Sequence, residues 1–488
     1  MKGALLVAGT TSDAGKSVVT AGLCRWLVRE GVSVAPFKAQ NMSNNSAVTA
    51  DGAEIGRAQA MQAAAARVEP EAAMNPVLLK PGSDRRSHVV VRGKPAGELS
   101  STDFVDGRRH LAAAAYDAFD ELSGRYDVVV AEGAGSPTEI NLRAGDYVNL
   151  GLARHADIPT VVVGDIDRGG VFAAMYGTVA LLDPADQALV AGFVVNKFRG
   201  ELDLLRPGLE SLAALTGRPT YGVLPWRPDL WLDSEDALDL EGRRVSSERA
   251  ALKVAVVRLP RISNFTDVDA LGLEPDLDVV FAQHPRALAD ADLIVLPGTR
   301  ATISDLAWLR ERGLDRAVLD HAAAGRPVLG ICGGFQMLGR TVSDPHGVEG
   351  AAASVEGLGL LPVSTEFAVE KALRLPTGEA LGQPVSGYEI HHGRITRDGA
   401  SEFLGGARDG HVFGTMWHGS LESDGFRQAF LAEVLPGRAA STVSFPGARE
   451  ARLDLLGDLV EEHLDVEALL TLVENGAPAL PTLRAGLS

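Results

Sequence analysis

Residues 4–17 read ALLVAGTTSDAGKS, and this stretch determines the fold of the first half of the chain. The apolar run at residues 4–8 predicts a buried strand, and residues 16–30 have the pattern of a helix. A loop with Gly-Lys-Ser between a strand and a helix is typical of a phosphate-binding P-loop. Backbone N–H groups at the helix N-terminus would hold phosphates, Lys16 would neutralise their charge and Ser17 would reach Mg²⁺.

The loop departs from the usual P-loop spacing. Five residues instead of four separate Gly9 from Gly15, and Thr10 stands at the first-glycine position. The alternative interpretation is an ordinary strand-to-helix turn that contains Gly-Lys-Ser by chance. Because strand, loop and helix agree, we predict a nucleotide site, and its residues are Thr10, Thr11, Asp13, Ala14, Gly15, Lys16 and Ser17.

Outward from this loop, short apolar strands alternate with helical segments, which predicts an α/β fold with a doubly wound parallel sheet. A charged stretch at 236–252 breaks the pattern and is predicted to be a linker. A second α/β run begins at Lys253, so we expect two doubly wound domains. The predicted boundaries are a P-loop domain at 1–235, a second domain at 253–440, and a helical extension with a tail at 441–488.

Two more loops of the first domain carry polar residues. Glu132 ends an apolar strand and precedes a Gly-rich loop, where a carboxylate beside the P-loop is placed to hold Mg²⁺ together with Ser17. An incidental acid at a strand end is the alternative. Asn196 and Pro225 follow later strands and are predicted to line the nucleotide.

The second domain contains a candidate nucleophile. Residues 325–339 read GRPVLGICGGFQMLG, in which a strand runs into Gly-Ile-Cys-Gly-Gly and a helix follows. This pattern predicts a nucleophile elbow with Cys332 at its apex. A thiolate needs a base, and His418 is the best candidate. Cys24 lies in the apolar pattern of the first helix and is predicted to be a core residue.

Composition narrows the functional class. The chain has 488 residues, of which 46 are Lys or Arg and 64 are Asp or Glu, so the net charge is −18. That charge disfavours a general nucleic-acid binder. The sequence shows no apolar run long enough for a membrane span. Two cysteines make no disulfide framework, and we expect a cytoplasmic protein.

Two family resemblances follow from these motifs. The P-loop variant resembles the dethiobiotin synthetase branch of P-loop proteins. The cysteine elbow with a distant histidine resembles the class I, or triad, glutamine amidotransferases, which implies oxyanion N–H groups from Gly298 and Gly333. The usual triad acid stands two residues after the histidine, where this chain has Ser420. Glu422 is the nearest acid and is expected to orient His418.

Several longer strings resemble the cobyric acid synthase family over roughly residues 1–430. They are KAQNMSNN at 38–45, EGAGSP through NLR at 132–143, DIDRGGVF at 165–172, NKFRG at 196–200, RISNFTD at 261–267 and GYEIH at 387–391. In that family the acid two residues after the histidine is also absent. The related a,c-diamide synthases share both domains but lack the first string.

The resemblance implies a glutamine-hydrolysing amide ligase of cobalamin biosynthesis. ATP with Mg²⁺ would activate carboxylates of a corrinoid as acyl phosphates, and ammonia made from glutamine at Cys332 would attack them. The implied reaction amidates the b, d, e and g side chains of adenosylcobyrinic a,c-diamide or its hydrogenobyrinic equivalent. The substrate contacts it implies are Lys38, Gln40, Asn41, Asn45, Arg143, Asp146 and Arg168.

The substrate bears several carboxylates and the chain is acidic, so local positive charge must offset the field where the corrinoid docks. The basic residues in or near the family strings are Lys38, Arg57, Lys80, Arg85, Arg86, Arg143 and Arg168. No obligate protein partner is implied.

Other functions remain open at this stage. One is an a,c-diamide synthase or an amidotransferase for another carboxylated metabolite. Another is a partitioning-type ATPase with a vestigial glutaminase domain, although its signature lysine position is occupied by Thr11. A third is a plain glutaminase with a regulatory nucleotide domain.

Overall fold

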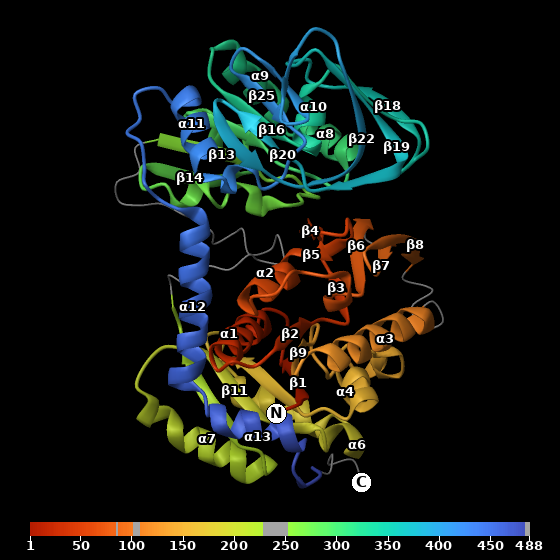
Figure 1. Cartoon of the computed structure of the whole chain (residues 1–488), viewed down its shortest axis with the longest axis vertical. Helices are drawn as coiled ribbons and strands as arrows, with labels where there is room; N and C mark the ends of the chain where they lie inside the picture. Colours follow the sequence, from red (N-terminus) through yellow and green to blue (C-terminus); the bar gives the residue numbers. More distant parts are fainter. Residues whose placement is uncertain (84–85, 101–107, 228–251, 484–488) are drawn as a thin grey trace.

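The computed structural model describes residues 1–83, 86–100, 108–227 and 252–483. Two α/β domains lie one above the other, and one long helix runs from the upper to the lower domain (Figure 1). We call the lower one, which contains the phosphate loop, the P-loop domain. The upper one, which contains Cys332, is the elbow domain.

A six-stranded parallel sheet forms the centre of the P-loop domain, in the order β12-β11-β10-β1-β9-β2. Its strands are β1 (Gly3–Gly9), β2 (Val34–Phe37), β9 (Val128–Glu132), β10 (Thr160–Asp165), β11 (Val190–Phe198) and β12 (Thr220–Pro225). Because β9, β1 and β10 are neighbours, the loops at their carboxyl ends meet at one edge, where α/β sheets bind ligands.

Helices cover both faces of this sheet. They are α1 (Lys16–Arg29), α2 (Arg57–Ala65), α3 (Arg109–Arg125), α4 (Leu150–Ala156), α5 (Val171–Ala180), α6 (Pro184–Gln187) and α7 (Leu202–Thr216). Cys24 on α1 is completely buried in an apolar cluster, and burial raises the pKa of its thiol. The prediction that Cys24 is a core residue is confirmed.

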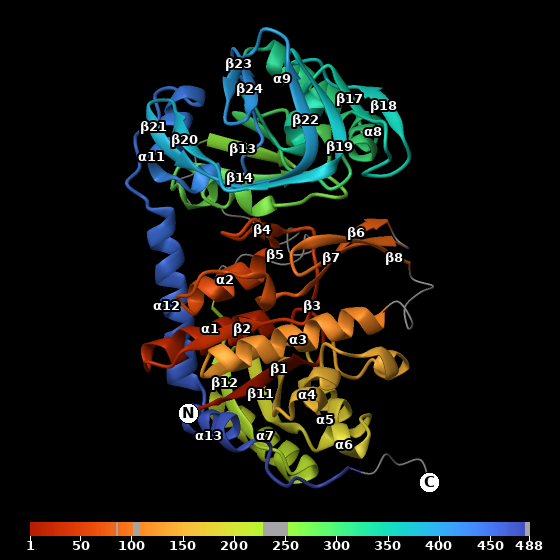
Figure 2. The same cartoon turned by 45° about the vertical axis from the view of Figure 1, so that its right-hand side comes forward.

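Between the main sheet and the elbow domain lies a layer of short strands (Figures 1 and 2). One small sheet has the order β3-β6-β7-β8, and β4 pairs with β5 as a hairpin. Their bounds are β3 (Gln40–Met42), β4 (Ser46–Val48), β5 (Glu54–Gly56), β6 (Val77–Ser83), β7 (Arg86–Val91) and β8 (Lys94–Ser100). The sequence analysis missed this layer, and for β3, β4 and β5 the reason is that strands of three residues are too short to show alternation.

The elbow domain is built on a second, seven-stranded sheet with the order β14-β13-β15-β16-β25-β24-β23. The strands from β14 to β25 are parallel, and β24 and β23 are antiparallel. The bounds are β13 (Leu252–Val257), β14 (Leu277–Ala282), β15 (Leu293–Leu296), β16 (Val328–Ile331), β23 (Ser401–Phe403), β24 (Gly406–Asp409) and β25 (Val412–Thr415).

A smaller sheet and four helices complete this domain. The sheet has the order β18-β17-β19-β22, with β17 (Thr341–Asp344), β18 (Ala353–Glu356), β19 (Val363–Arg374) and β22 (Glu389–Arg397), and β20 (Thr377–Ala380) pairs with β21 (Gln383–Ser386). The helices are α8 (Thr302–Glu311), α9 (Leu314–Ala323), α10 (Gly333–Leu338) and α11 (Asp424–Val434).

The chain then returns to the P-loop domain through α12 (Phe445–His463) and α13 (Val466–Asn475). Leu456 and Val460 of α12 lie in the same apolar cluster as α1. Gly22 of α1 allows this close packing, since a Cβ there would lie 2.8 Å from the Leu456 carbonyl oxygen. Arg25, also on α1 and fully buried, binds Glu450 at 2.9 Å. The helices of the predicted C-terminal extension therefore complete the core of the P-loop domain.

The prediction of an α/β fold with two doubly wound domains is confirmed. The predicted linker at 236–252 lies outside the described residues except for Leu252, the first residue of β13. Among the residues that the structure describes, no helix has both the length and the apolar character to cross a membrane.

The packing of α12 on α1 predicts a stability effect. Leu456→Ala should lower the free energy of unfolding by about 2–5 kcal/mol, because it removes a buried side chain and leaves a cavity. Urea unfolding followed by circular dichroism measures the change. The exposed Glu461 on the same helix is the control, and Glu461→Ala should change the stability by less than about 0.5 kcal/mol. Equal stabilities of the two variants would contradict the packing.

Candidate active sites

The phosphate loop runs from β1 into α1 and has the backbone expected of an anion site. Gly15 has φ 99°, a left-handed conformation that favours glycine. The Nδ2 of Asn196 packs against Gly15 and donates to the carbonyl of Ala14 at 3.0 Å. Lys16 Nζ lies over the loop, 3.0 Å from the Thr11 carbonyl oxygen and 3.1 Å from that of Gly135. The ammonium is thus held where phosphates would bind.

Glu132, at the end of β9, lies next to this loop. Its Oε1 accepts from Ser17 Oγ at 3.0 Å and from Lys38 Nζ at 2.9 Å, and its Oε2 accepts from Gln62 Nε2 at 2.5 Å. The carboxylate is 1% exposed, and a buried charge is stable only when hydrogen-bonding or charged partners compensate it. Within the described chain, no group of three or more acidic, histidine or cysteine side chains is placed to share a metal ion.

The other predicted nucleotide residues surround the same loop. Thr10 donates its backbone N–H to the Val163 carbonyl at 2.9 Å. Lys197 bridges the loop to β10, with Nζ 3.0 Å from the Asp13 carbonyl oxygen and 2.8 Å from Asp165 Oδ2. Pro225 ends β12, next to β11. Thr10 and Lys197 are therefore held in or against the loop, whereas the strand that Pro225 ends lies at the edge of the sheet, and a contact of Pro225 with nucleotide remains a prediction.

The predicted elbow at Cys332 is present between β16 and α10. Cys332 has φ 49° and ψ −108°, a conformation that costs a non-glycine residue about 1–3 kcal/mol. Its backbone N–H donates to the Thr415 carbonyl at 2.7 Å. Backbone packs tightly around it, since a Cβ on Gly334 would lie 2.0 Å from the Leu296 carbonyl oxygen. The strained turn therefore requires its flanking glycines.

His418 follows β25, and its imidazole interacts with the side chain of Cys332. Its Nδ1 lies 2.7 Å from Asp267 Oδ2, and Asp267 Oδ1 accepts the Gly419 N–H at 2.8 Å. Burial acts to lower the pKa of His418, but Asp267 and Cys332 outweigh it and raise the pKa to about 10. The imidazole is consequently charged at neutral pH, beside the sulfur.

This geometry corrects the expectation that Glu422 orients His418. The acid beside His418 Nδ1 is Asp267, whose side chain comes from the segment after β13. Glu422 Oε1 instead lies 2.5 Å from Arg57 of the P-loop domain, and its Oε2 lies 2.9 Å from Arg449. The expectation assumed an acid near the histidine in sequence, whereas the fold supplies one 151 residues away.

The two glycines predicted to form an oxyanion hole are close to the elbow. A Cβ on Gly298 would lie 3.0 Å from His418 Cε1, and one on Gly333 would lie 3.1 Å from the Thr299 nitrogen. Gly333 is also the first residue of α10. The 298–299 backbone and the N-terminus of α10 therefore meet beside Cys332.

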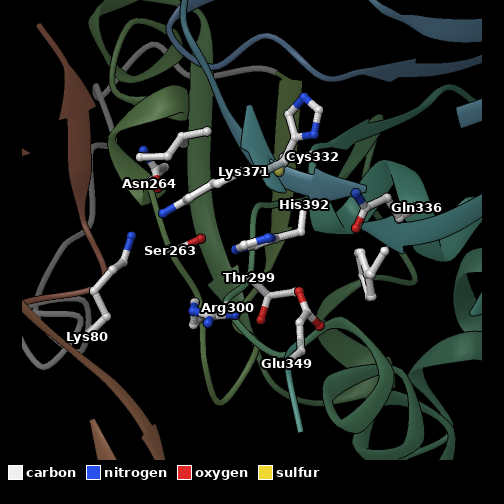
Figure 3. Close-up of a pocket in the computed structure, with 13 residues that line it drawn as sticks. Lys80, Ser263, Asn264, Thr299, Arg300, Cys332, Gln336, Glu349, Lys371 and His392 are labelled. Atoms are coloured by element: carbon white, nitrogen blue, oxygen red, sulfur yellow. The ribbon is translucent and has the colours of Figure 1, made fainter. Parts of the chain in front are cut away.

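A pocket next to Cys332 is lined by both domains. Figure 3 shows Lys80 entering from a strand of the P-loop domain, while Asn264, Lys371 and His392 come from the elbow domain. Glu54 on β5 contacts Lys80. Its fully buried carboxylate is 2.5 Å from Lys80 Nζ and 2.5 Å from Lys371 Nζ. Burial lowers the pKa of Lys80 to about 8 despite this partner.

The residues predicted to contact substrate fall into two groups. Gln40, Asn41 and Asn45, like Lys38, are at most 6% exposed and belong to the layer between the domains. Arg143, Asp146 and Arg168 lie in loops of the P-loop domain. Their contacts with a corrinoid remain predictions.

The loop residues differ in how they are held. Arg143 binds Asp186 through Nε and Nη2 at 2.6 and 2.7 Å. Asp146 accepts the backbone N–H groups of Val148, Asn149 and Gly151. Arg168 is 65% exposed and lies 3.7 Å from Asp13 of the phosphate loop.

The remaining basic candidates either form ion pairs inside the protein or lie outside the described residues. Arg57 and Lys80 hold Glu422 and Glu54, as described above. Arg85 lies outside the described residues, and only the backbone of Arg86 is described.

Comparison with known proteins identifies both domains. Residues 5–239 match the CobQ/CobB/MinD/ParA nucleotide binding domain, and residues 253–426 match the CobB/CobQ-like glutamine amidotransferase domain. A cobyric acid synthase of Mycolicibacterium gilvum is 73% identical over 488 residues, covering 99% of both chains. The chain belongs to the cobyric acid synthase family. Cobyric acid synthases of Mycolicibacterium vanbaalenii and Mycobacterium tuberculosis are 72% and 73% identical, again over 99% of both chains.

Membership of the cobyric acid synthase family makes the chain an amide-forming ligase with nucleotide-binding and glutamine amidotransferase domains. The sequence analysis missed Asp267 as the partner of His418. Asp267 is the last residue of the string RISNFTD, which is one of the strings that carry the family resemblance. The sequence therefore marked Asp267, but it did not show that Asp267 pairs with His418.

The contact between Asp267 and His418 predicts a pH effect. Asp267→Asn should lower kcat for glutamine hydrolysis by ~10²–10⁴-fold. The pKa of His418 should fall from about 10 towards its ordinary value, because the main charge that raises it is lost. The imidazolium then deprotonates at lower pH, so the alkaline limb of the rate profile should move to lower pH.

Glutamate release measured across pH tests this effect, with Glu422→Gln as the matched control. The control should keep the alkaline limb in place, because Glu422 is paired with Arg57 and Arg449. The assignment of Asp267 as the partner of His418 would be contradicted if the alkaline limb of the rate profile did not move in Asp267→Asn. It would also be contradicted if the limb moved equally in both variants.

Proposed function

We propose that this chain converts adenosylcobyrinic a,c-diamide, or its hydrogenobyrinic equivalent, to cobyric acid by amidating the b, d, e and g carboxylates. The observation that carries the proposal is the pairing of two sites in one chain. A Cys332–His418–Asp267 arrangement lies in one domain, and Lys16, Ser17 and Glu132 lie in the other. The first suits glutamine hydrolysis and the second suits phosphoryl transfer from ATP.

In the proposed glutaminase step, the Cys332 thiolate attacks the carboxamide carbon of glutamine. Backbone N–H groups of Gly298 and Gly333 stabilise the oxyanion. His418 gives its proton to the leaving nitrogen, so ammonia departs and a thioester remains. His418 then takes a proton from water, which attacks the thioester and releases glutamate. The net change is glutamine plus water to glutamate plus ammonia.

In the proposed synthetase step, a corrinoid carboxylate oxygen attacks the γ-phosphorus of ATP, giving an acyl phosphate and ADP. Lys16 and the N-terminus of α1 stabilise the charge on the transferring phosphoryl group. Ammonia attacks the acyl carbon, loses a proton and expels phosphate, which leaves the amide. A carboxylate is a poor electrophile, so the reaction needs this activation.

Ser17 and Glu132 would hold Mg²⁺ in this site. Their oxygens lie 3.0 Å apart and are hard donors, and Mg²⁺ commonly takes one or two protein ligands with phosphate and water oxygens. The bound ion would neutralise phosphate charge during transfer.

The corrinoid is expected at the open edge beside the phosphate loop. Arg168 is an exposed cation of that edge, and its planar guanidinium suits carboxylate binding. Arg143 and Asp146 would shape the neighbouring loop through the contacts described above.

Mass spectrometry of the corrinoid after incubation with ATP and glutamine tests the proposal. Each amidation exchanges a carboxyl oxygen for an NH group and is resolved as a separate mass. The a,c-diamide should advance through one product for each of the b, d, e and g positions. A chain that amidates cobyrinic acid only at a and c would instead be an a,c-diamide synthase. Glutamate release without any corrinoid product would indicate a plain glutaminase.

The two-site scheme predicts opposite effects of two substitutions. Cys332→Ala should abolish glutamine-dependent amidation and leave ammonia-dependent amidation within about two-fold, because the thiol only supplies ammonia. Lys16→Ala should abolish amidation with either donor, because it removes the charge that stabilises phosphoryl transfer. Product formation is measured with glutamine and, separately, with ammonium chloride. Normal ammonia-dependent turnover by Lys16→Ala would refute the synthetase site.

A further inference from the structure

We infer that His391 is a further catalytic residue of the glutaminase site, and that its Nε2 accepts a hydrogen bond from the carboxamide nitrogen of glutamine. His391 lines the pocket beside Cys332 but is neither the proposed nucleophile nor its proposed base. The inference rests on the proposed function, in which glutamine is hydrolysed at Cys332. It adds the residue that distinguishes the carboxamide of the substrate from a carboxylate.

Strand β22 places His391 beside the nucleophile. Gly393 of this strand packs against α10, since a Cβ there would lie 2.3 Å from Nε2 of Gln336. Gln336 lies one turn after Cys332 and donates its backbone N–H to the Cys332 carbonyl at 2.9 Å. Because alternate residues of a strand share a face, His391 lies on the same face of β22 as Gly393, which contacts the elbow helix.

The surroundings of His391 determine which ring nitrogen carries a hydrogen. Nδ1 lies 2.9 Å from the Gly393 carbonyl oxygen, and a carbonyl oxygen only accepts, so Nδ1 bears the hydrogen. Burial, followed by the nearby charge of His418, lowers the pKa of His391 to about 3. The ring is therefore neutral at pH 7, and Nε2 has a lone pair without a hydrogen.

This lone pair has no partner among the described residues. The Nε2 atom of His391 is buried and accepts no hydrogen bond from any group that the structure describes. Gln336 also lines the pocket with an unpartnered buried atom, but that atom is an amide donor. The nearby acceptor Glu349 is already engaged by the backbone N–H and the hydroxyl of Thr302, at 2.6 and 3.2 Å. Since buried acceptors are nearly always satisfied, a ligand is expected to supply the donor for His391.

The carboxamide of glutamine supplies such a donor. Its oxygen would take the N–H groups of the oxyanion hole, and its nitrogen carries two hydrogens that need acceptors. The two imidazoles beside Cys332 are in opposite states. His418 is charged and can give a proton to this nitrogen, whereas His391 is neutral and accepts an N–H. His391 takes up no proton, so the net change of the proposed glutaminase step stays the same.

The same lone pair disfavours glutamate. Both oxygens of its side-chain carboxylate are acceptors, so one of them would face Nε2 of His391 without a hydrogen between them. A site built around a hydrogen bond discriminates strongly against an analogue that cannot make it. His391 therefore favours the substrate over the product, which helps glutamate to leave after hydrolysis.

His391→Asn in the full-length chain tests the assignment. The asparagine amide can still donate to the Gly393 carbonyl in place of Nδ1, whereas no atom replaces Nε2. Glutamate release is measured with glutamine as the substrate, and glutamate is then added as the inhibitor. We expect kcat/KM for glutamine to fall by about 10–100-fold, as for one lost hydrogen bond to the substrate. The KI of glutamate should stay the same or fall.

His391→Gln is the second variant, because Oε1 of the introduced amide can accept at the position of Nε2. It should keep kcat/KM for glutamine within about five-fold of the unaltered chain. The matched control is His411→Gln in the same domain. His411 Nε2 lies 2.7 Å from the Ala322 carbonyl oxygen, and His411 precedes β25 at the end away from Thr415, which contacts Cys332. The control should keep kcat/KM and KI within about two-fold.

Equal losses in His391→Asn and His391→Gln would overturn the assignment, because they would indicate a structural role of the ring. An undiminished kcat/KM in His391→Asn would also overturn it and would leave a bound water as the partner of Nε2. A KI of glutamate that rises in step with the loss of kcat/KM would do the same. If the unaltered chain released no glutamate, or if Cys332→Ala released it at an equal rate, the proposed function itself would fail. That outcome is distinct from a failure of the role of His391.

Discussion

The arrangement of the two domains depends on the carboxylate of Glu54. It is completely buried and lies between one lysine from each domain, Lys80 and Lys371. Burial opposes its charge, but Lys371 and Lys80 outweigh burial and hold the pKa of Glu54 well below its usual range. Buried ion pairs contribute little net stability, yet removal of one partner leaves an uncompensated charge. The ion pairs of Glu54 therefore determine the position of the β4–β5 hairpin on the elbow domain. They contribute less to the stability of that contact.

His418, the proposed base, is adjacent to this contact. Tyr388 stacks on His418 at 5.3 Å between ring centroids and pairs with it through two backbone hydrogen bonds. Asn264 Nδ2 donates both to the Tyr388 hydroxyl and to the Ser46 carbonyl, at 2.7 Å each. Val48 of the hairpin packs with Tyr388 and Ile390 in a small apolar cluster. Displacement of the hairpin would consequently disturb the surroundings of His418.

Sequence patterns predicted the features that depend on neighbouring residues. The P-loop and the Cys332 elbow are strand–turn–helix motifs whose glycines, lysine and cysteine lie within one short segment. The parallel sheets followed from alternating apolar strands and helices. The small layer β3 to β8 was missed, and its first three strands are too short to show a pattern. Several of its polar residues are predicted to contact substrate because they cluster in a family string, and the fold places them in buried positions between the domains.

The chain alone predicted which residues carry chemistry, because Cys332, His418, Lys16 and Glu132 stand in local contexts that few other functions need. Only the tertiary structure decided how those residues are paired. Asp267 reaches His418 across 151 residues, and Glu422 turns to Arg57 of the other domain. Such pairings depend on strand order and domain docking, since a side chain's partner is set by distance in space. No spacing along the sequence encodes that distance.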